Sequence, residues 1–470
     1  MMIPKKPKVT IVPINIEAKT CITQIFQHFS HENWAMMLDS SNSEHENGQF
    51  DIFVANPLAT ITTTDNKSEI SHEDKRKEYS CENPLHLLQQ LINQYLSGNN
   101  LIEPVDIPFI AGALGYFGYD LGRCFEHLPS KNKREYHTPD MAVGIYTWSV
   151  VKDNHNGHFY LCYIDCYPHP TVDEIESLIL KKTSKHTFTL TSSWQANMSK
   201  TEYEQKIAKI KSYLNAGDCY QTNLAQRFTA TYTGDEWQAY LTLRNENKAP
   251  FSAFIRLPTT NILSISPERF LLIRDTEVET KPIKGTRPRQ KDSDADALQV
   301  QSLLSSAKDK AENLMIVDLL RNDLSKHCKP GSISVPELFK IETFTAVHHL
   351  VSKVTGKLQS DKTAIDLLHG AFPGGSITGA PKIRAMQIID ELEPNNRNIY
   401  CGSIGYIGIK GDMDTNICIR TLLCEQDAVD NKVHCWAGGG IVIDSKASDE
   451  YQESLDKVSK ILPILDIDMT

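Results

Sequence analysis

Two strand-like runs on either side of Asp275-Thr276 constrain the fold most strongly. The runs are Arg269 to Arg274 and Glu277 to Lys281, and the pair between them suits a tight turn. The sequence therefore predicts an antiparallel hairpin. Such a hairpin would bring Glu268, just before the first strand, almost opposite Lys284, just after the second.

Lys284 is a candidate nucleophile, although most lysines are solvated surface charges. Pro282 fixes its own backbone, Gly285 allows close backbone approach, and Thr286 adds a hydroxyl group. A lysine with a pKa near 10.4 must be neutralised to attack, which costs about 4.6 kcal/mol at pH 7. We therefore expect a closed, largely dry pocket around the amine. Glu268 beside it would supply the acid that expels a hydroxyl group during the attack.

Composition narrows the class of protein. The chain has 470 residues, 49 basic and 59 acidic, with a net charge of -10, which argues against nucleic acid or an acidic membrane surface as the main partner. Its 11 cysteines form no Cys-x-x-Cys pair, so neither a zinc site nor a disulfide framework is indicated. The stretch from Met1 to Pro13 is too short and interrupted for a signal peptide or a spanning helix, and we expect a cytoplasmic protein.

The chain divides near residues 182 to 198, which are rich in Ser, Thr and Lys. Before this segment, apolar and polar residues alternate from Met141 to Cys166 as in a largely antiparallel sheet. After it, Ser199 and Glu202 form a capping box that begins a helix ending at Gly217. We predict an N-terminal domain over 1–182 and a catalytic domain over 199–470.

Other segments have recognisable patterns. Asn83-Pro84 opens a helix through Leu96, and a single long helix is predicted from Ala297 to Leu324. Four glycines follow the first of these helices in a strand-rich stretch without the spacing of a nucleotide loop, which favours tight sheet packing. Near the C-terminus, five apolar residues form one helix stripe, and three charged residues take the opposite face. The glycines are Gly112, Gly115, Gly118 and Gly122; the stripe is Ala447, Tyr451, Leu455, Val458 and Leu462; the charged residues are Glu450, Glu453 and Lys457.

The segments Ser266-Pro267-Glu268 and Pro282 to Thr286, with several later motifs, resemble those of the chorismate-utilising enzymes nearly end to end. The resemblance implies an α+β fold of two facing, largely antiparallel β-sheets with outer helices, as in anthranilate synthase component I. Lys284 favours the aminodeoxychorismate synthase branch, in which this lysine attacks the chorismate ring. Anthranilate synthases usually carry alanine there.

The resemblance also implies a Mg2+ site at Glu312 and Glu453, with Glu450 as the alternative to Glu453. Glu312 lies among apolar neighbours, where a carboxylate needs a partner. Arg420 interrupts an apolar strand, and a carboxylate of chorismate would satisfy its charge. Of the pair His348-His349, only His349 matches the family, and adjacent strand residues face opposite ways. The implied substrate-binding residues are Gly285, Thr286, His349, Ser376, Tyr400, Arg420, Gly438, Gly439, Gly440 and Lys457.

A second pocket is implied, because related enzymes hold tryptophan there as a feedback inhibitor or as a bound amino acid. Trp34 to Ser41 and Phe50 to Val54 have strand patterns of their own, so packing in the core is the simpler interpretation of this region. The corresponding tryptophan-binding positions are Ser40, Asn47, Gly48, Gln49, Phe50, Pro250, Phe251 and Ser252.

The nucleophile that completes the reaction is predicted to be ammonia. Isochorismate and salicylate synthases use a lysine at the position of Gln221 to activate water, and an amide has no useful pKa for that task. The chain has no Gly-x-Cys-x-Gly glutaminase motif, so a glutamine amidotransferase subunit, component II, is the expected partner. The implied reaction makes 4-amino-4-deoxychorismate for 4-aminobenzoate and folate. The alternatives are an anthranilate synthase component I and a non-catalytic tryptophan-binding subunit.

Overall fold

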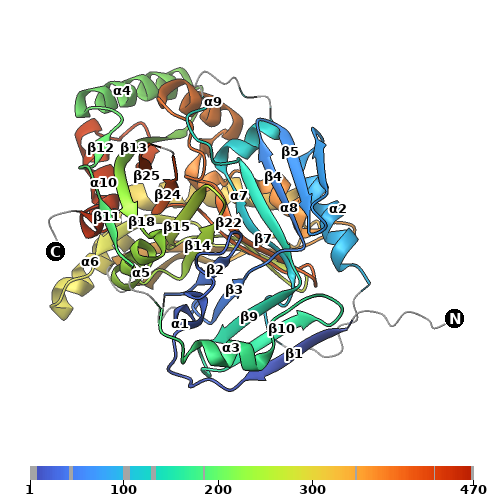
Figure 1. Cartoon of the computed structure of the whole chain (residues 1–470). Coiled ribbons are helices and arrows are strands. Elements are labelled where there is room, and N and C mark those ends of the chain that lie inside the picture. Colours follow the sequence, from blue (N-terminus) through green and yellow to red (C-terminus); the bar gives the residue numbers. More distant parts are fainter. Residues whose placement is uncertain are drawn as a thin grey trace.

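The computed structural model describes residues 8–41, 46–98, 106–126, 128, 134–183, 186–344, 347–427 and 429–466. Within these ranges the protein is α+β, with two large antiparallel sheets and helices packed around them (Figure 1). This confirms the fold class expected from the resemblance. The prediction about the N-terminal stretch rests partly on Met1 to Lys6, which lie outside the described residues.

The first sheet has thirteen strands and runs in the order β1-β10-β9-β3-β2-β14-β15-β24-β25-β13-β11, with β12 and β21 also paired to β13. The strands are β1 (Val9–Ile14), β2 (Met36–Asp39), β3 (Phe50–Val54), β9 (Trp148–Asp153), β10 (Phe159–Ile164), β11 (Phe188–Leu190), β12 (Gln195–Ala196), β13 (Gln221–Gly234), β14 (Phe251–Arg256), β15 (Thr260–Ser266), β21 (Gly379–Ala380), β24 (Thr421–Glu425) and β25 (Asn431–Ile441).

The second sheet has twelve strands in the order β18-β20-β17-β16-β23-β22-β7-β8-β4-β5-β6, with β19 also paired to β20. The strands are β4 (Ala59–Thr64), β5 (Lys67–His72), β6 (Lys77–Ser80), β7 (Gly112–Phe117), β8 (Met141–Tyr146), β16 (Arg269–Arg274), β17 (Glu277–Thr280), β18 (Ile283–Pro288), β19 (Ser334–Thr343), β20 (Val347–Lys357), β22 (Ser403–Gly408) and β23 (Met413–Asn416).

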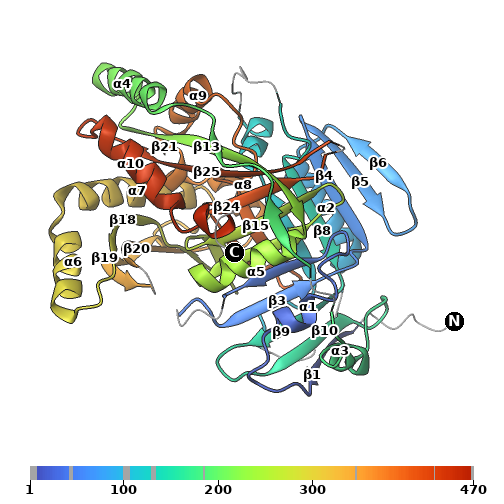
Figure 2. The same ribbon diagram turned by 60° about the vertical axis from the view of Figure 1, so that its left-hand side comes forward.

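The largest core lies between the two sheets. It joins Ile52 and Val54 of β3 to Tyr116 of β7 and Val143 of β8, all at most 3% exposed. A second core covers the other face of the first sheet, where Phe26 packs edge-on against Trp237. Figure 2 shows the helices that carry these two aromatic residues, α1 and α5, beside that sheet. The sheets are thus held face to face by apolar burial, with helices outside.

The ten α-helices of the described residues largely follow the sequence signals. Asn83 caps α2, and the predicted capping box of Ser199 and Glu202 begins α4, which ends at Gly217 with φ of 78°. The helices are α1 (Thr23–Phe26), α2 (Pro84–Leu96), α3 (Val172–Leu178), α4 (Lys200–Ala216), α5 (Glu236–Asn247), α6 (Ser293–Ser305), α7 (Ala307–Ser325), α8 (Ala364–Ala371), α9 (Lys382–Leu392) and α10 (Ala447–Val458), with 3-10 turns η1 (Tyr119–Cys124), η2 (Gly375–Ile377) and η3 (Pro463–Leu465).

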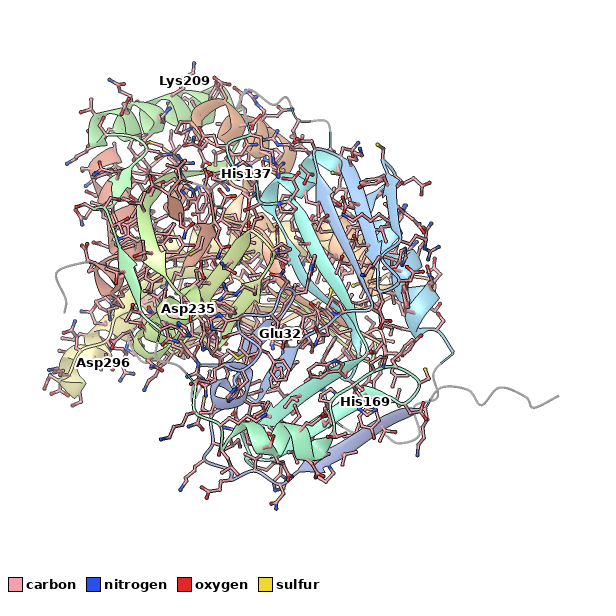
Figure 3. All side chains as sticks on the ribbon, in the orientation of Figure 1. Glu32, His137, His169, Lys209, Asp235 and Asp296 are labelled. Carbon is pink, nitrogen blue, oxygen red and sulfur yellow. The ribbon has the colours of Figure 1, made fainter. Side chains whose placement is uncertain are left out.

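The prediction of one long helix from Ala297 to Leu324 is wrong. The chain breaks at Ser306, whose ψ of 108° is extended and whose side chain accepts a hydrogen bond from the amide of Asp309. Ser306 therefore ends α6 and caps α7, because a serine hydroxyl satisfies a free amide at a helix start. Figure 3 shows Asp296 on α6, which projects from the body of the protein.

The predicted hairpin is confirmed. β16 and β17 pair antiparallel with Arg274 opposite Glu277, and Asp275 in the turn has φ of 58°. The prediction of tight packing at the glycines also holds. A Cβ atom on Gly115 of β7 would lie 2.1 Å from the carbonyl oxygen of Ala142 on the neighbouring strand β8. Only glycine allows that approach.

Both sheets combine strands from either side of residues 182–198. β2 pairs with β14 in the first sheet, and β7 pairs with β22 in the second. Two short strands, β11 and β12, lie within that segment and pair with β13. The division into 1–182 and 199–470 stays a prediction about the sequence.

The structure describes all the cysteines of the chain and the helices that could be tested for crossing a membrane. The 11 cysteines are free thiols, and seven of them are buried. Burial of this kind is typical of cysteines that serve as small apolar packing residues. Among the described residues, no helix combines the length and the apolar character needed to cross a membrane.

Candidate active site

Glu268 and Lys284 meet at Ser376. Glu268 follows β15, Lys284 lies on β18, and Ser376 belongs to the turn η2. The Ser376 hydroxyl donates to Glu268 Oε1 at 2.8 Å, and Lys284 Nζ donates to the Ser376 carbonyl oxygen at 3.1 Å. The acid and the amine, expected from the hairpin to be neighbours, thus share one contact residue.

The surroundings move both groups towards their neutral forms. Burial raises the pKa of Glu268 to about 7, against the opposing effects of the Ser376 hydrogen bond and the Lys284 charge. Burial also lowers the pKa of Lys284, although Glu312 and Glu268 oppose that shift. The residue Lys284 is half-buried as a whole, but its amine is the enclosed part. This is the desolvation that a nucleophilic lysine requires.

Three glutamates gather between α7, α10 and β25. Glu312 lies on α7, and Glu450 and Glu453 lie on α10. A Cβ atom on Gly439 would be 3.4 Å from Glu450 Oε2 and 3.4 Å from Glu453 Oε1, so both oxygens border that glycine. Glu450 is only 4% exposed, although the sequence places it on the charged face of its helix.

Two lysines pair with these carboxylates. Lys308 Nζ lies 3.3 Å from Glu450 Oε1 and 3.8 Å from Glu312 Oε1. Lys457 Nζ lies 2.7 Å from Glu453 Oε1 and also donates to the Gly438 carbonyl oxygen at 2.7 Å. With Lys284, three ammonium groups therefore face three carboxylates.

The glutamates have the chemistry of a magnesium site. Glu312 Oε1 is buried and makes no hydrogen bond within the described part of the chain. Burial raises the pKa of Glu312, and the nearby charge of Glu450 adds to that rise. Carboxylate oxygens are the ligands that Mg2+ prefers, and it usually takes one or two of them. In the described ranges no group of three acidic, His or Cys side chains stands close enough to hold a metal by itself.

The three glycines of β25 line the same place. Gly438 and Gly440 stand opposite Ala225 and Asn223 of β13, yet the Gly438 carbonyl turns away from β13 to Lys457. Alternate residues of a strand point their peptide groups to the same edge, so the amides of Gly438 and Gly440 share that direction. β24 pairs with β25 only up to Cys435, so β24 does not occupy the edge of Gly438 and Gly440.

Four further residues predicted to bind the substrate are Gly285, Thr286, His349 and Tyr400, and three of them contact other side chains. Thr286 stands opposite His349 on β20, and its hydroxyl is 2.8 Å from His349 Nδ1. Tyr400 stacks on Trp436, with ring centroids 6.1 Å apart, and lies under the guanidinium group of Arg397. Gly285 has φ of 80°, where a side chain would be strained.

His348 differs from His349 in its partners, as the alternation along a strand predicts. Its Nε2 is 2.9 Å from Asp296 Oδ1 of α6, and its Nδ1 is 2.9 Å from the Thr343 hydroxyl. His348 thus holds α6 against the sheet.

Arg420 does not interrupt a strand, so that part of the prediction is wrong. It precedes β24 with φ of 51°, where the chain passes from β23 of the second sheet to β24 of the first. Its backbone oxygen accepts from Ile265, but its guanidinium group has no hydrogen bond or ion pair to any described residue. Burial lowers the pKa of Arg420 without a compensating anion. A cation in that position calls for an external carboxylate.

The positions named for tryptophan surround a separate cavity of about 350 Å³ between the sheets. Six of the eight line it, namely Asn47, Gln49, Phe50, Pro250, Phe251 and Ser252. Ser40 instead binds Asp51 through its amide and hydroxyl, both at 2.7 Å. Gly48 accepts from Asn154 at 3.2 Å. Ser40 and Gly48 therefore do not line the cavity and instead bind Asp51 and Asn154.

Sequence reasoning missed Lys308, Arg397 and Trp436. The four-residue spacing of Lys308 and Glu312 was a visible signal of an ion pair on one helix face. The contact of Lys308 with Glu450, 142 residues away, was not. Trp436 carried no local signal either, because it stacks on Tyr400, which comes 36 residues earlier, and Arg397 lies over the same ring.

Comparisons with known proteins identify the family of the chain. Residues 35–463 match the chorismate binding enzyme family. The chain belongs to that family, and it is therefore an enzyme of the class that acts on chorismate.

Two similar relatives carry the name aminodeoxychorismate synthase component 1. The chain is 52% identical over 440 residues to aminodeoxychorismate synthase component 1 of Klebsiella aerogenes, covering 93% of this chain and 95% of the relative. It is 50% identical over 443 residues to the protein of the same name from Escherichia coli K12, covering 94% and 95%. Among solved structures, anthranilate synthase component I from Streptococcus pneumoniae TIGR4 is 29% identical, with a TM-score of 0.75 over 89% of this chain and 93% of that one.

Proposed function

We propose that this chain aminates chorismate at carbon 4 and so makes 4-amino-4-deoxychorismate, the precursor of 4-aminobenzoate in folate synthesis. The observation that carries the proposal is the pair Glu268 and Lys284, a buried acid with a pKa of about 7 beside an enclosed amine. An acid that is half protonated near neutral pH can expel a hydroxyl group. The names and 48–52% identities of three relatives support the same reaction.

The chemistry proceeds in two displacements. Neutral Lys284 Nζ forms a bond to carbon 2 of chorismate, the two conjugated ring double bonds shift towards carbon 4, and the bond from carbon 4 to its hydroxyl breaks. Glu268 gives its proton to that hydroxyl, which leaves as water. Ammonia then bonds to carbon 4, the two double bonds shift back, and the bond from carbon 2 to Lys284 breaks. The new ammonium group returns one proton to Glu268, so the enzyme is restored.

The substrate's two carboxylates suit two ends of the site. Arg420 and Tyr400 would bind one carboxylate. The amides of Gly438 and Gly440 would bind the other, next to the Mg2+ held by Glu312 with Glu453 or Glu450. When bound, Mg2+ would supply a positive ion that a carboxylate of the substrate can coordinate. Lys457, which donates a hydrogen bond to the Gly438 carbonyl oxygen, would contact the substrate at the same end of the site.

Ammonia is proposed as the second nucleophile because Gln221, at the position where related enzymes use a lysine to activate water, is an amide and cannot act as a base. Gln221 is fully buried and its amide donates to Asn223 Oδ1 at 3.2 Å. A Cβ atom on Gly440 would meet the Gln221 nitrogen at 2.5 Å, so the amide lies against the proposed carboxylate site. Component 1 in the relatives' names fits a partner, which we propose is a glutamine amidotransferase that releases ammonia.

The direct test of the function is the product formed from chorismate, ammonium and Mg2+ by the purified chain. We expect 4-amino-4-deoxychorismate, detected by its conversion to 4-aminobenzoate with the lyase that acts on it. Anthranilate with pyruvate would favour the anthranilate synthase alternative. No product of either kind, from a folded protein, would favour a non-catalytic subunit.

Arg420 gives a sharper test of substrate binding. We expect Arg420→Gln to raise KM for chorismate about 10-fold to 100-fold, since a hydrogen bond to a charged group contributes about 1.5–3 kcal/mol. The free protein should lose no stability, because the guanidinium group makes no ion pair or hydrogen bond to the described residues. Initial rates and thermal unfolding midpoints measure both effects.

Arg397 is the matched control, because its guanidinium binds Glu393 at 2.6 Å and 2.9 Å and is 2% exposed. Arg397→Gln should lower the unfolding midpoint, since it removes two charged hydrogen bonds from the buried carboxylate of Glu393. An Arg420→Gln variant that is less stable and unchanged in KM would refute the assignment.

We also propose that the cavity beside β2 and β14 binds tryptophan. Its wall combines Phe251 and Pro250 with Arg269 and Glu279, which offers an apolar face and both charges for an amino acid. Tryptophan released on denaturing the purified chain, or bound in equilibrium dialysis, would support this. Absence in both experiments would refute it.

A further inference from the structure

We infer that Lys308 is an internal cation that occupies the place of the metal and must leave before Mg2+ binds. The inference rests on the proposed magnesium site and concerns what that site does in its absence. Lys308 Nζ spans two carboxylates from different helices, at 3.3 Å from Glu450 and 3.8 Å from Glu312. Mg2+ would need oxygens at about 2.0–2.1 Å, so it and the ammonium group cannot share that space.

The charges of the site favour such a displacement. With Lys284 neutral, Lys308 and Lys457 face Glu312, Glu450 and Glu453, so these groups sum to −1 before any ligand arrives. A divalent cation alone would change that sum to +1 in a partly buried cluster. Withdrawal of one ammonium group to solvent, or the arrival of an anion with the metal, removes this excess.

Lys308 is the lysine that can withdraw. Its side chain is 49% exposed and starts in the first turn of α7, where solvent is adjacent. The Lys284 amine is enclosed and bonded to Ser376. Lys457 makes two contacts of 2.7 Å, to Glu453 and to Gly438. Glu450 cannot follow Lys308 outward, because it is buried and accepts a hydrogen bond of 2.6 Å from Ser445.

The consequence is that Lys308 weakens metal binding while it stabilises the metal-free protein. Lys308 lies near both Glu450 and Glu312, so its loss would remove positive charge from beside each carboxylate. This role differs from that of a substrate-binding or catalytic residue, because it acts only when the metal is absent. It also predicts that chorismate, with two negative charges, assists metal entry by balancing the divalent charge.

The test is direct metal binding to the full chain without chorismate. We expect Lys308→Met, which keeps the length and loses the charge, to bind Mg2+ about fivefold to tenfold more tightly by calorimetry. Mn2+ binding followed by electron paramagnetic resonance should change in the same direction. In EDTA, the variant should unfold at a lower temperature than the wild type, and saturating Mg2+ should reduce that gap.

Lys310→Met is the matched control on the same helix. Its ammonium group lies over the Phe339 ring at 5.8 Å, so its loss should leave metal affinity unchanged. Lys308→Arg keeps the charge and should bind metal less tightly than Lys308→Met. Equal or weaker binding by Lys308→Met would overturn the inference alone. No metal binding by either protein would overturn the magnesium assignment as well, while leaving the amination product as a separate question.

Discussion

Lys284→Ala is expected to abolish a covalent adduct that the wild type forms with chorismate and Mg2+ when ammonia is withheld. The adduct should add the mass of chorismate less one water, because the 4-hydroxyl group leaves as the amine bonds to carbon 2. Intact-protein mass spectrometry measures it. With ammonia present, the rate of amination should fall about 100-fold or more, as is common when a group that acts in the transition state is removed.

The variant also separates two mechanisms. Lys291→Ala changes an exposed lysine nearby and should keep both the adduct and the rate. If no adduct forms with the wild type, and Lys284→Ala still makes 4-amino-4-deoxychorismate equally fast, ammonia attacks chorismate directly. Lys284 would then act as a charge near the substrate, and its contact with Ser376 would serve to position that charge.

The proximity of Glu268 to Lys284 could be predicted because the hairpin is local, whereas their shared contact with Ser376, 92 residues after Lys284, could not. A turn at Asp275 fixes the register of two short strands, and 15 residues then determine which side chains meet. The capped helices α2 and α4 were predictable for the same reason. Asn83 and Ser199 satisfy free amides of their own helices, so the signal and the structure lie in one short segment.

The features that could not be predicted depend on contacts between distant segments. The break at Ser306 separates two runs that each have helical composition, and the direction of α6 is fixed by Asp296 binding His348 of β20. The edge strand β6 has three exposed residues of four, so its sequence lacks the alternation that marks a half-buried strand. Glu450 shows the same difficulty, since its burial depends on Ser445 and on Lys308 of α7.

Glu268→Gln is expected to lower the rate about 100-fold to 10,000-fold, the usual contribution of a general acid. In the wild type, the rate should fall as the pH rises through about 7, because only the protonated carboxyl can give a proton to the leaving hydroxyl. The variant should lack that limb of the pH profile. Ser376→Ala is the control, because its hydroxyl favours the ionised carboxylate. Its loss should move the limb to higher pH. A wild-type profile without a limb near neutral pH would contradict the role of Glu268 as the acid.

The raised pKa of Glu268 favours catalysis, but it should lower the free energy of unfolding at higher pH. An unfolded glutamate titrates near 4.5 and Glu268 near 7, so the native state binds more protons between these values. Stability should therefore fall as the pH rises across this window, by roughly 3 kcal/mol at most. Glu268→Gln has no such carboxylate, so the ligand-free variant should be more stable than the wild type at pH 8 and closer to it at pH 5. Urea unfolding at both pH values measures the difference. A wild type that gains stability over Glu268→Gln from pH 5 to pH 8 would show that Glu268 is held ionised in the folded protein, and it could not then serve as the proton donor.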